Sequence, residues 1–180
     1  MRPAANRETA IAQITTGVEY GLHCLLFLVD PRGEAQQAGA RDLAELQGVS
    51  PEYVAKLFTK LQKAGLVIAT EGARGGFRLA RRPEEISVLD VVVAIDGDKS
   101  LFECREIRER CVVAQELTSS SDRPLEVCSI HAIMLEAEAR MREVLASHTL
   151  GEIASTVAAK VPVAYTDAIA KWLGARRAAR

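Results

Sequence analysis

Aromatic side chains are scarce in this chain of 180 residues, where Phe, Trp and Tyr together make up 4%. Aliphatic side chains must therefore fill the hydrophobic core. So few rings also argue against a protein that stacks single-stranded bases on aromatic side chains.

Long apolar runs are missing as well. The longest, Gly21 to Val29, is interrupted by His23 and is too short to cross a bilayer. The chain does not open with the charged region, apolar stretch and cleavage site of a secretory signal. We therefore expect a cytoplasmic protein without a membrane partner. In that compartment its four cysteines suggest metal, redox or core roles before disulfides.

Several motifs of catalysis are absent. The sequence has no G-x-x-x-x-G-K-[ST] phosphate loop, no C-x-x-C pair and no nucleophile elbow. We therefore expect that the protein is not an enzyme.

Positive charge is concentrated in one stretch. The formal net charge is -1, yet residues 53–82 hold seven basic residues and one acid. Such an excess favours a polyanionic partner, through the local field and through counterion release. The alternative is an ordinary solvated basic face.

The same stretch follows a helix-turn-helix pattern. Helices are predicted over residues 8–30, 40–47 and 51–64, with Gly48 at the turn. Ser50 is a typical N-cap, and Pro51 takes the first helical position. A glycine turn between two such helices is typical of DNA-binding units.

A basic hairpin is predicted directly behind this unit. Strands are expected over 66–69 and 77–80, around the loop Gly72-Ala73-Arg74-Gly75-Gly76. The glycines would let the backbone approach a phosphate chain closely. A short helix capped by Ser87 follows over 88–95. The predicted fold is mainly α with a small β-hairpin wing, a winged helix-turn-helix.

The second half of the chain is less regular. Residues 100–127 have no clean periodicity, and a long amphipathic helix is predicted from Cys128 onward. We interpret it as a dimerisation helix; packing on its own domain is the alternative. Short helices are expected over 149–157 and 168–173, with Trp172 packing inward. The predicted divisions are a DNA-binding domain (8–97), a cysteine-containing loop (98–127), the dimerisation helix with its following helix (128–158) and a tail (159–180).

Three cysteines are spaced C-x6-C-x16-C at Cys104, Cys111 and Cys128. Thiolates are soft ligands, so the set suggests an iron–sulfur cluster or zinc, or else three small buried hydrophobes. Cys24 lies in an apolar helical stretch and is predicted to be core.

Two further pairs share a helix face. Glu19 and His23 are four residues apart, and His131 follows Cys128 by three. Each pair could bind a metal or could simply form a hydrogen bond.

Taken together, several segments resemble the Rrf-type winged-helix transcriptional regulators, the family that includes the IscR, NsrR and RsrR types. They are the first-helix run ITTGVEYGLHCLL, the segment VSPEYVAK, the loop GARGGF, the run LDVVVAIDG, and the late CSIHAIM with TLGEI. The resemblance covers most of residues 14–155. The redox-sensing RsrR type is the most similar, through VEYGLHC and FECREIR.

The resemblance implies a [2Fe–2S] cluster shared across a homodimer, with a [4Fe–4S] cluster as the alternative. Two cysteines would come from one subunit, and Glu19 with His23 from the other. An aromatic at the Tyr20 position would relay the redox signal. Asp122 stands where the RsrR pattern has a cysteine. The second thiolate would thus come from Cys111 or Cys104, or be absent. A set of three cysteines with Glu19 resembles the ligands of the NsrR type. A set that includes His131 with Cys128 resembles the cysteine-histidine pair of the IscR type.

The predicted function is that of a homodimeric repressor, associated with the nucleoid, which binds a palindromic duplex operator and senses redox state, nitric oxide or iron through its cluster. The alternative is a cluster-free regulator with a cysteine thiol switch. The residues predicted to contact DNA are Ser50, Glu52, Tyr53, Lys56, Lys60, Arg74 and Arg78.

Overall fold

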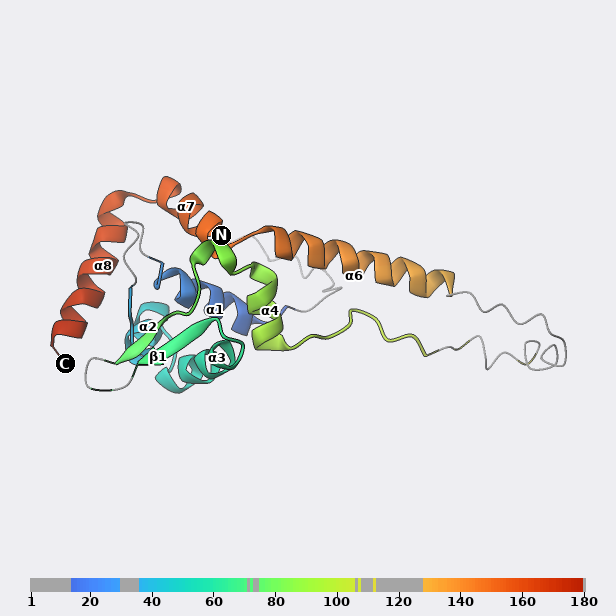
Figure 1. Ribbon diagram of the computed structural model, residues 1–180, viewed down its shortest axis with the longest axis horizontal. Coiled ribbons are helices and arrows are strands. Elements are labelled where there is room, and N and C mark those ends of the chain that lie inside the picture. Colours follow the sequence, from blue (N-terminus) through green and yellow to red (C-terminus); the bar gives the residue numbers. More distant parts are fainter. Residues whose placement is uncertain are drawn as a thin grey trace, which may run out of the picture. The chain divides into compact units, whose positions relative to one another are not determined.

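The computed structural model describes residues 14–29, 36–70, 72, 75–105, 107, 112 and 128–179. The chain divides into two compact units (Figure 1). Unit 1 contains Met1–Asp98 and Leu145–Arg180, and unit 2 contains Lys99–Val144.

Unit 1 is built on three helices, α1 (Thr16–Leu26), α2 (Ala40–Gln47) and α3 (Pro51–Lys63). Between α2 and α3, Gly48 adopts a left-handed φ of 66°, which favours glycine and makes the sharp turn. Phe58 and Leu61 of α3 are fully buried, as is Leu43 of α2. The helix-turn-helix prediction is confirmed.

The first helix is shorter than predicted. Residues 8–13 lie outside the described part of the chain, and Ile14 and Thr15 are not helical. The helix begins after Thr15, because the Asp96 carboxylate accepts hydrogen bonds from the Thr15 backbone N–H (2.9 Å) and hydroxyl (2.6 Å). It ends at Leu26 instead of Asp30: Leu28 N–H donates to the Leu25 carbonyl three residues back, which tightens the chain out of the α-helix.

The wing is an antiparallel hairpin of β1 (Val67–Thr70) and β2 (Gly76–Leu79), each displaced by one residue from its prediction. Ala38 extends it by a bridge to Phe77. A Cβ on Gly76 would lie 2.8 Å from the Ala38 carbonyl oxygen. Gly76 thus permits close approach of the protein's own backbone. The approach of the glycine loop to phosphate stays a prediction. The fold class, mainly α with a β-hairpin wing, is confirmed.

After the wing, the short 3-10 helix η1 (Pro83–Glu85) leads to α4 (Val88–Asp96). The predicted cap is confirmed: Ser87 Oγ accepts from Asp90 N–H (3.1 Å), and the Asp90 carboxylate accepts from Ser87 N–H (2.9 Å). Ser87 also forms a β-bridge with Thr149. This bridge joins the start of α4 to the chain that enters α7 (Leu150–Lys160), which runs three residues beyond its predicted end.

The tail forms a full helix, α8 (Val163–Ala178), where only residues 168–173 were predicted. Leu173 is 5% exposed, and Trp172 and Ile169 pack against the core beside it. Trp172 therefore packs inward as expected. The rest of α8 is mostly exposed, which explains why hydrophobic periodicity did not reveal its length.

Unit 2 contains most of α6 (Ser129–Ser147), which begins one residue after the predicted Cys128 and whose last three residues belong to unit 1. No residue of α6 is buried. An extended segment runs beside it: the Glu138 carboxylate accepts from Ser100 Oγ (2.8 Å) and from Leu101 N–H (2.9 Å). Within the described part of the chain, no helix is long and apolar enough to span a membrane.

Helices α1 and α4 pack closely against each other at Gly21. A Cβ on Gly21 would lie 2.3 Å from Cδ1 of Ile95, which is itself 3% exposed. Gly17, one turn earlier, faces Ile95 and Leu57. Glycine at position 21 therefore sets how closely the two helices approach.

We predict that Gly21→Ala lowers the free energy of unfolding by about 1–3 kcal/mol, because the added methyl group forces buried Ile95 to move. Gly174→Ala is the matched control, since a Cβ there meets nothing within 4 Å. It should raise stability by about 0.5–1 kcal/mol through helix propensity. Urea unfolding of both variants measures this, and equal effects would contradict the packing argument.

Candidate nucleic-acid interface and metal ligands

The N-terminal end of α3 is held by its predicted cap. Ser50 Oγ accepts a hydrogen bond from Tyr53 N–H at 3.2 Å, and Pro51 occupies the first turn. Ser50, Glu52 and Lys56 are exposed at this end, while Tyr53 is half-buried. This hydrogen bond satisfies a backbone N–H in the first turn and so defines where α3 begins.

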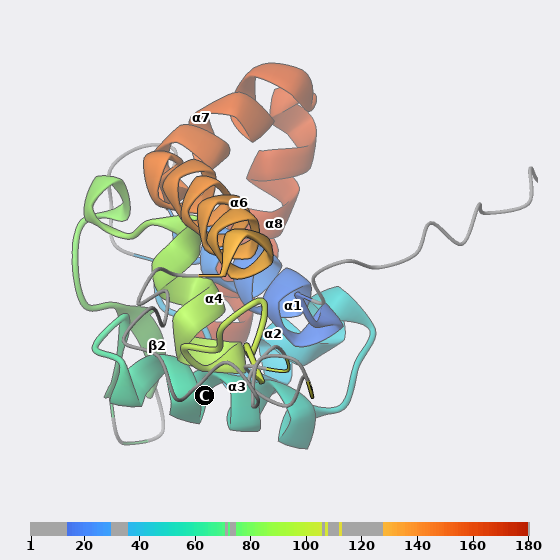
Figure 2. The same ribbon diagram turned by 90° about the vertical axis from the view of Figure 1, so that its right-hand side faces the viewer.

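Helix α3 has one buried face and one exposed, basic face. Val54, Leu57, Phe58 and Leu61 are buried in the core. Lys56, Lys60 and Lys63 lie on the exposed side. Figures 1 and 2 both place α3 along one end of unit 1, with α1 and α4 packed behind it. The basic side of α3 is therefore open to a large partner.

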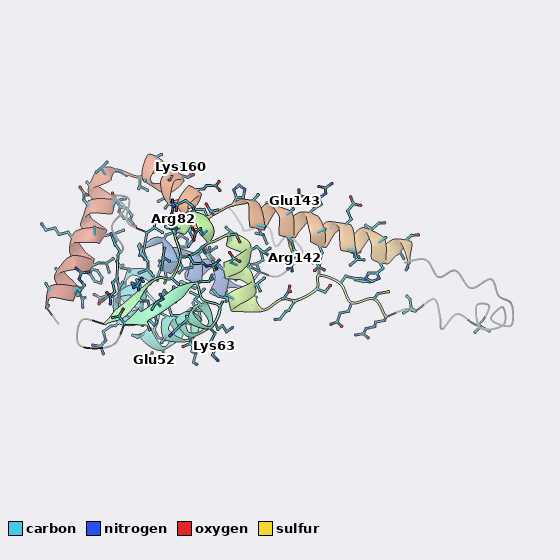
Figure 3. All side chains as sticks on the ribbon, viewed as in Figure 1. Glu52, Lys63, Arg82, Arg142, Glu143 and Lys160 are labelled. Carbon is cyan, nitrogen blue, oxygen red and sulfur yellow. The ribbon has the colours of Figure 1, made fainter. Side chains whose placement is uncertain are left out.

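The basic residues that the structure describes in the stretch 53–82 lie on more than one side of unit 1. Arg81 lies 3.9 Å from the Asp90 carboxylate and donates to the Glu85 carbonyl, and Arg82 lies 3.5 Å from Glu84. Figure 3 shows Arg82 on a different side of unit 1 from Lys63 and Glu52. The candidate interface is thus narrower than the charge count suggested.

Lys60 has an internal partner that the sequence did not reveal. Its Nζ donates a 2.6 Å hydrogen bond to the carbonyl of Ile95, in the last turn of α4. A cation there satisfies a carbonyl that has no partner within the helix and complements the negative end of the helix dipole. Lys56, Lys63 and Arg78 are exposed and make no ion pair with any residue in the described part of the chain.

On the wing, Arg78 of β2 pairs in register with Ile68 of β1, and both are exposed. Arg74, predicted at the wing tip, lies outside the described residues. Its contact with DNA stays a prediction.

The first helix presents its two candidate ligands to solvent. Glu19 and His23 are both exposed and lie one turn apart on α1. Between them in sequence, Tyr20 is half-buried and its ring meets the Tyr53 ring edge-on, with centroids 5.6 Å apart and planes at 87°. The helix that bears Glu19 and His23 is therefore in direct contact with the N-terminal end of α3.

Cys24 points the other way, into the core, and its exposure is 0%. The prediction that it is a core residue is confirmed. Burial raises the pKa of its thiol from 9.0 to about 12. At neutral pH it stays protonated, which makes it a poor metal ligand and a poor redox group.

Unit 2 brings two of the candidate cysteines toward one end of α6. The Cys128 carbonyl accepts from Ala132 N–H at 2.8 Å, so Cys128 stands at the N-terminal end of the helix. The segment held by Glu138 runs toward that end, where the Phe102 ring lies 6.0 Å from the His131 ring. Cys104 follows two residues later, and both thiols are half-buried.

The donor types fit an iron–sulfur cluster: thiols on unit 2, and a carboxylate with an imidazole on α1. Cys111 and Asp122 lie outside the described residues. Among the residues that the structure places, no three His, Cys, Asp or Glu side chains gather into a metal site. Glu19 and His23 belong to unit 1, and Cys104, Cys128 and His131 to unit 2.

Thiol labelling of the metal-free protein provides a first test. At pH 8 we expect Cys104 and Cys128 to react with a maleimide or a disulfide reagent while Cys24 does not, because its pKa of about 12 keeps it protonated and burial blocks access. Mass spectrometry of the native and the urea-unfolded protein identifies the labelled positions. Labelling of native Cys24 at the rate of Cys104 would contradict its assignment to the core.

Known sequences provide a comparison. A profile of the family Rrf2, described as "Iron-dependent Transcriptional regulator", matches residues 14–156. The chain is 33% identical over 141 residues to Protein rrf2 of Nitratidesulfovibrio vulgaris, covering 78% of this chain and 86% of that protein. It is 30% identical over 135 residues to the HTH-type transcriptional regulator IscR of Aliivibrio salmonicida, covering 74% and 73%. It is also 30% identical over 142 residues to the HTH-type transcriptional regulator NsrR of Geobacillus kaustophilus, covering 78% and 88%.

Solved structures agree on the fold. The global cysteine regulator CymR of B. subtilis superposes with a TM-score of 0.60 at 24% identity, covering 81% of this chain and 98% of that one. The oxidized form of Staphylococcus aureus CymR gives a TM-score of 0.56 at 25% identity, with 79% and 96% covered. The relatives are regulators of transcription, not enzymes.

Proposed function

The chain belongs to the Rrf2 family of DNA-binding transcriptional regulators, and from that premise we propose that it is a homodimeric repressor whose operator affinity depends on an iron–sulfur cluster. The observation that carries the proposal is the contact between Tyr20 and Tyr53. It joins the helix that bears two candidate ligands to the helix that would read DNA. Such a regulator would work in the cytoplasm, at the nucleoid.

In this proposal α3 enters the major groove. Ser50, Glu52, Tyr53 and Lys56 lie at its capped N-terminal end, the part of a recognition helix that contacts base edges. Lys60, Arg78 and Arg74 would contact phosphates, which position the protein without reading sequence. For Lys60 this requires sharing its ammonium, whose three donors exceed its one contact with Ile95.

The homodimer is supported by α6. Ile130, Ile133 and Val144 are 60%, 63% and 58% exposed on this helix. A partner helix would remove these apolar side chains from water. Two copies of the winged helix would then read the two halves of a palindrome, about 34–36 Å apart or a multiple of that.

The cluster would supply reversible one-electron chemistry. Cys128, with Cys104 or Cys111, would hold it from one subunit, and Glu19 with His23 from the other, as in the redox-sensing RsrR type. His131 is a further candidate. Replacing a thiolate by a neutral imidazole lowers the negative charge around the iron and raises its potential. The iron-dependent description of the family supports iron, and [4Fe–4S] is the alternative to [2Fe–2S].

The second candidate is a cluster-free regulator with a thiol switch. The half-burial of Cys104 and Cys128 favours it, since thiols in such positions are open to oxidation. A similar protein, Staphylococcus aureus CymR, has been solved in an oxidized form.

The DNA interface is tested with two basic residues from the same stretch. Lys56→Ala should weaken binding roughly 5- to 10-fold at 0.1 M salt and lower the salt slope by about 0.9 for each phosphate that is no longer neutralised. Arg82→Ala should leave both unchanged, because Arg82 is paired with Glu84 and lies away from α3 (Figure 3). Fluorescence anisotropy on an operator selected from random duplexes measures both, and equal reductions in affinity would contradict the interface.

The shared cluster is tested by mixing two defective subunits. A subunit with Glu19→Ala and His23→Ala keeps its thiols, and one with Cys104→Ser and Cys128→Ser keeps its α1 ligands. Each homodimer should be colourless. A mixed dimer, isolated anaerobically with two affinity tags, should recover about half the wild-type iron and visible absorbance, because one of its two sites has every ligand.

A different result would contradict the shared site. If the wild type is coloured but neither the homodimers nor the mixed dimer binds iron, each site draws all its ligands from one subunit. A wild-type protein that is colourless after anaerobic purification, but whose DNA affinity changes with peroxide, would instead establish the thiol switch.

A further inference from the structure

Helix α8 lies beyond residues 14–156, the part of the chain that the family profile matches. It is nevertheless attached to the DNA-binding unit. Leu173 is buried in the core of unit 1, and Arg176 forms an ion pair with Glu45 in the last turn of α2. The Arg176 guanidinium also lies 4.6 Å from the centre of the Trp172 ring, which holds it in place.

The residue of α2 to which α8 is attached lies close in the sequence to α3, the helix proposed to read DNA. Glu45 precedes the Gly48 turn, and α3 begins directly after it. Figures 1 and 2 both show the C-terminal end of α8 at the same end of unit 1 as α3. The start of α8 lies at the opposite end, beside α7.

The basic residues of α8 lie on different sides of the helix. Arg177 follows Leu173 by four residues, so it lies on the side of the helix that faces the body of unit 1. It is exposed and makes no ion pair with any residue that the structure describes. Lys171 is also exposed, but it precedes Leu173 by two residues and therefore projects from the opposite side.

Glu45 would by itself repel a phosphate chain passing the α2–α3 turn. Its pairing with Arg176 neutralises that charge, and Arg177, the next residue of α8, adds an exposed cation. A DNA backbone that flanks the site read by α3 would meet a surface of suitable sign there.

We propose that α8 is an additional DNA-binding element, in which Arg176 fastens the helix to α2 and Arg177 contacts the phosphate backbone beside the half-site. This rests on the proposed role of α3 in the major groove. The contact would be independent of sequence, because a phosphate carries no base information. It would lengthen the footprint of each subunit beyond the winged helix.

The test uses the full-length dimer and a mixed-sequence duplex of about 40 base pairs, since backbone contacts do not require an operator. Binding is measured by anisotropy from about 50 to 300 mM salt for wild type, Arg177→Ala, Lys171→Ala and Lys56→Ala. Arg177→Ala should lower the slope of log affinity against log salt by about 0.9 for each phosphate it no longer neutralises, and weaken binding roughly 5- to 10-fold at 0.1 M salt. Lys171→Ala removes the same charge from the same helix and should change the slope little.

An unchanged slope for Arg177→Ala, or equal reductions for Arg177→Ala and Lys171→Ala, would overturn the proposal. The Lys56→Ala variant separates this failure from that of the proposed function. Weaker binding by Lys56→Ala alone would keep α3 at the DNA and remove α8. Unchanged binding by Lys56→Ala would count against the α3 interface itself. Circular dichroism of each variant checks that its helix content equals that of wild type.

Discussion

The close approach of α1 to α4 at Gly21 is the constraint on which the rest of unit 1 depends. Only a residue without a side chain leaves room for buried Ile95. The same end of α4 then makes two polar contacts: Asp96 binds the N-terminal end of α1 through Thr15, and the Ile95 carbonyl accepts from Lys60 of α3. Three helices from separate parts of the sequence are thereby tied together at a single turn.

This arrangement determines how a signal at α1 could reach DNA. The outer face of α1 carries Glu19 and His23, while its inner face is fixed by Gly21 and by the edge-on contact of Tyr20 with Tyr53. A pull on the outer face would move α1, α3 and α4 as a block, since close-packed cores do not deform continuously. In the proposed dimer, such a movement would change the distance between the two α3 helices and so their fit to an operator.

The local signals in the sequence predicted most of unit 1. Caps at Ser50, Ser87 and Thr149 fixed where helices begin, because a hydroxyl there satisfies a backbone N–H in the first turn. Contacts between distant residues could not be predicted. Nothing near Lys60 indicates that it bonds the Ile95 carbonyl, and nothing near Gly76 indicates that Ala38 crowds it. The ligand roles proposed for Glu19 and His23 come from the family resemblance, because their spacing alone leaves a simple hydrogen bond equally possible.

The residue pattern along α6 bears on the proposed dimer. Met134, Glu138, Met141 and Leu145 are half-buried, and Glu138 fixes the extended segment beside them. The exposed apolar residues Ile130, Ile133, Ala137 and Val144 follow a separate heptad spacing, and such a seam is suited to a partner helix. Arg140 interrupts it, but pairs with Glu143 of its own helix at 3.0 Å. A polar residue at one such position costs stability and specifies register. In the proposed dimer, this seam would therefore favour one defined alignment of two α6 helices over non-specific association.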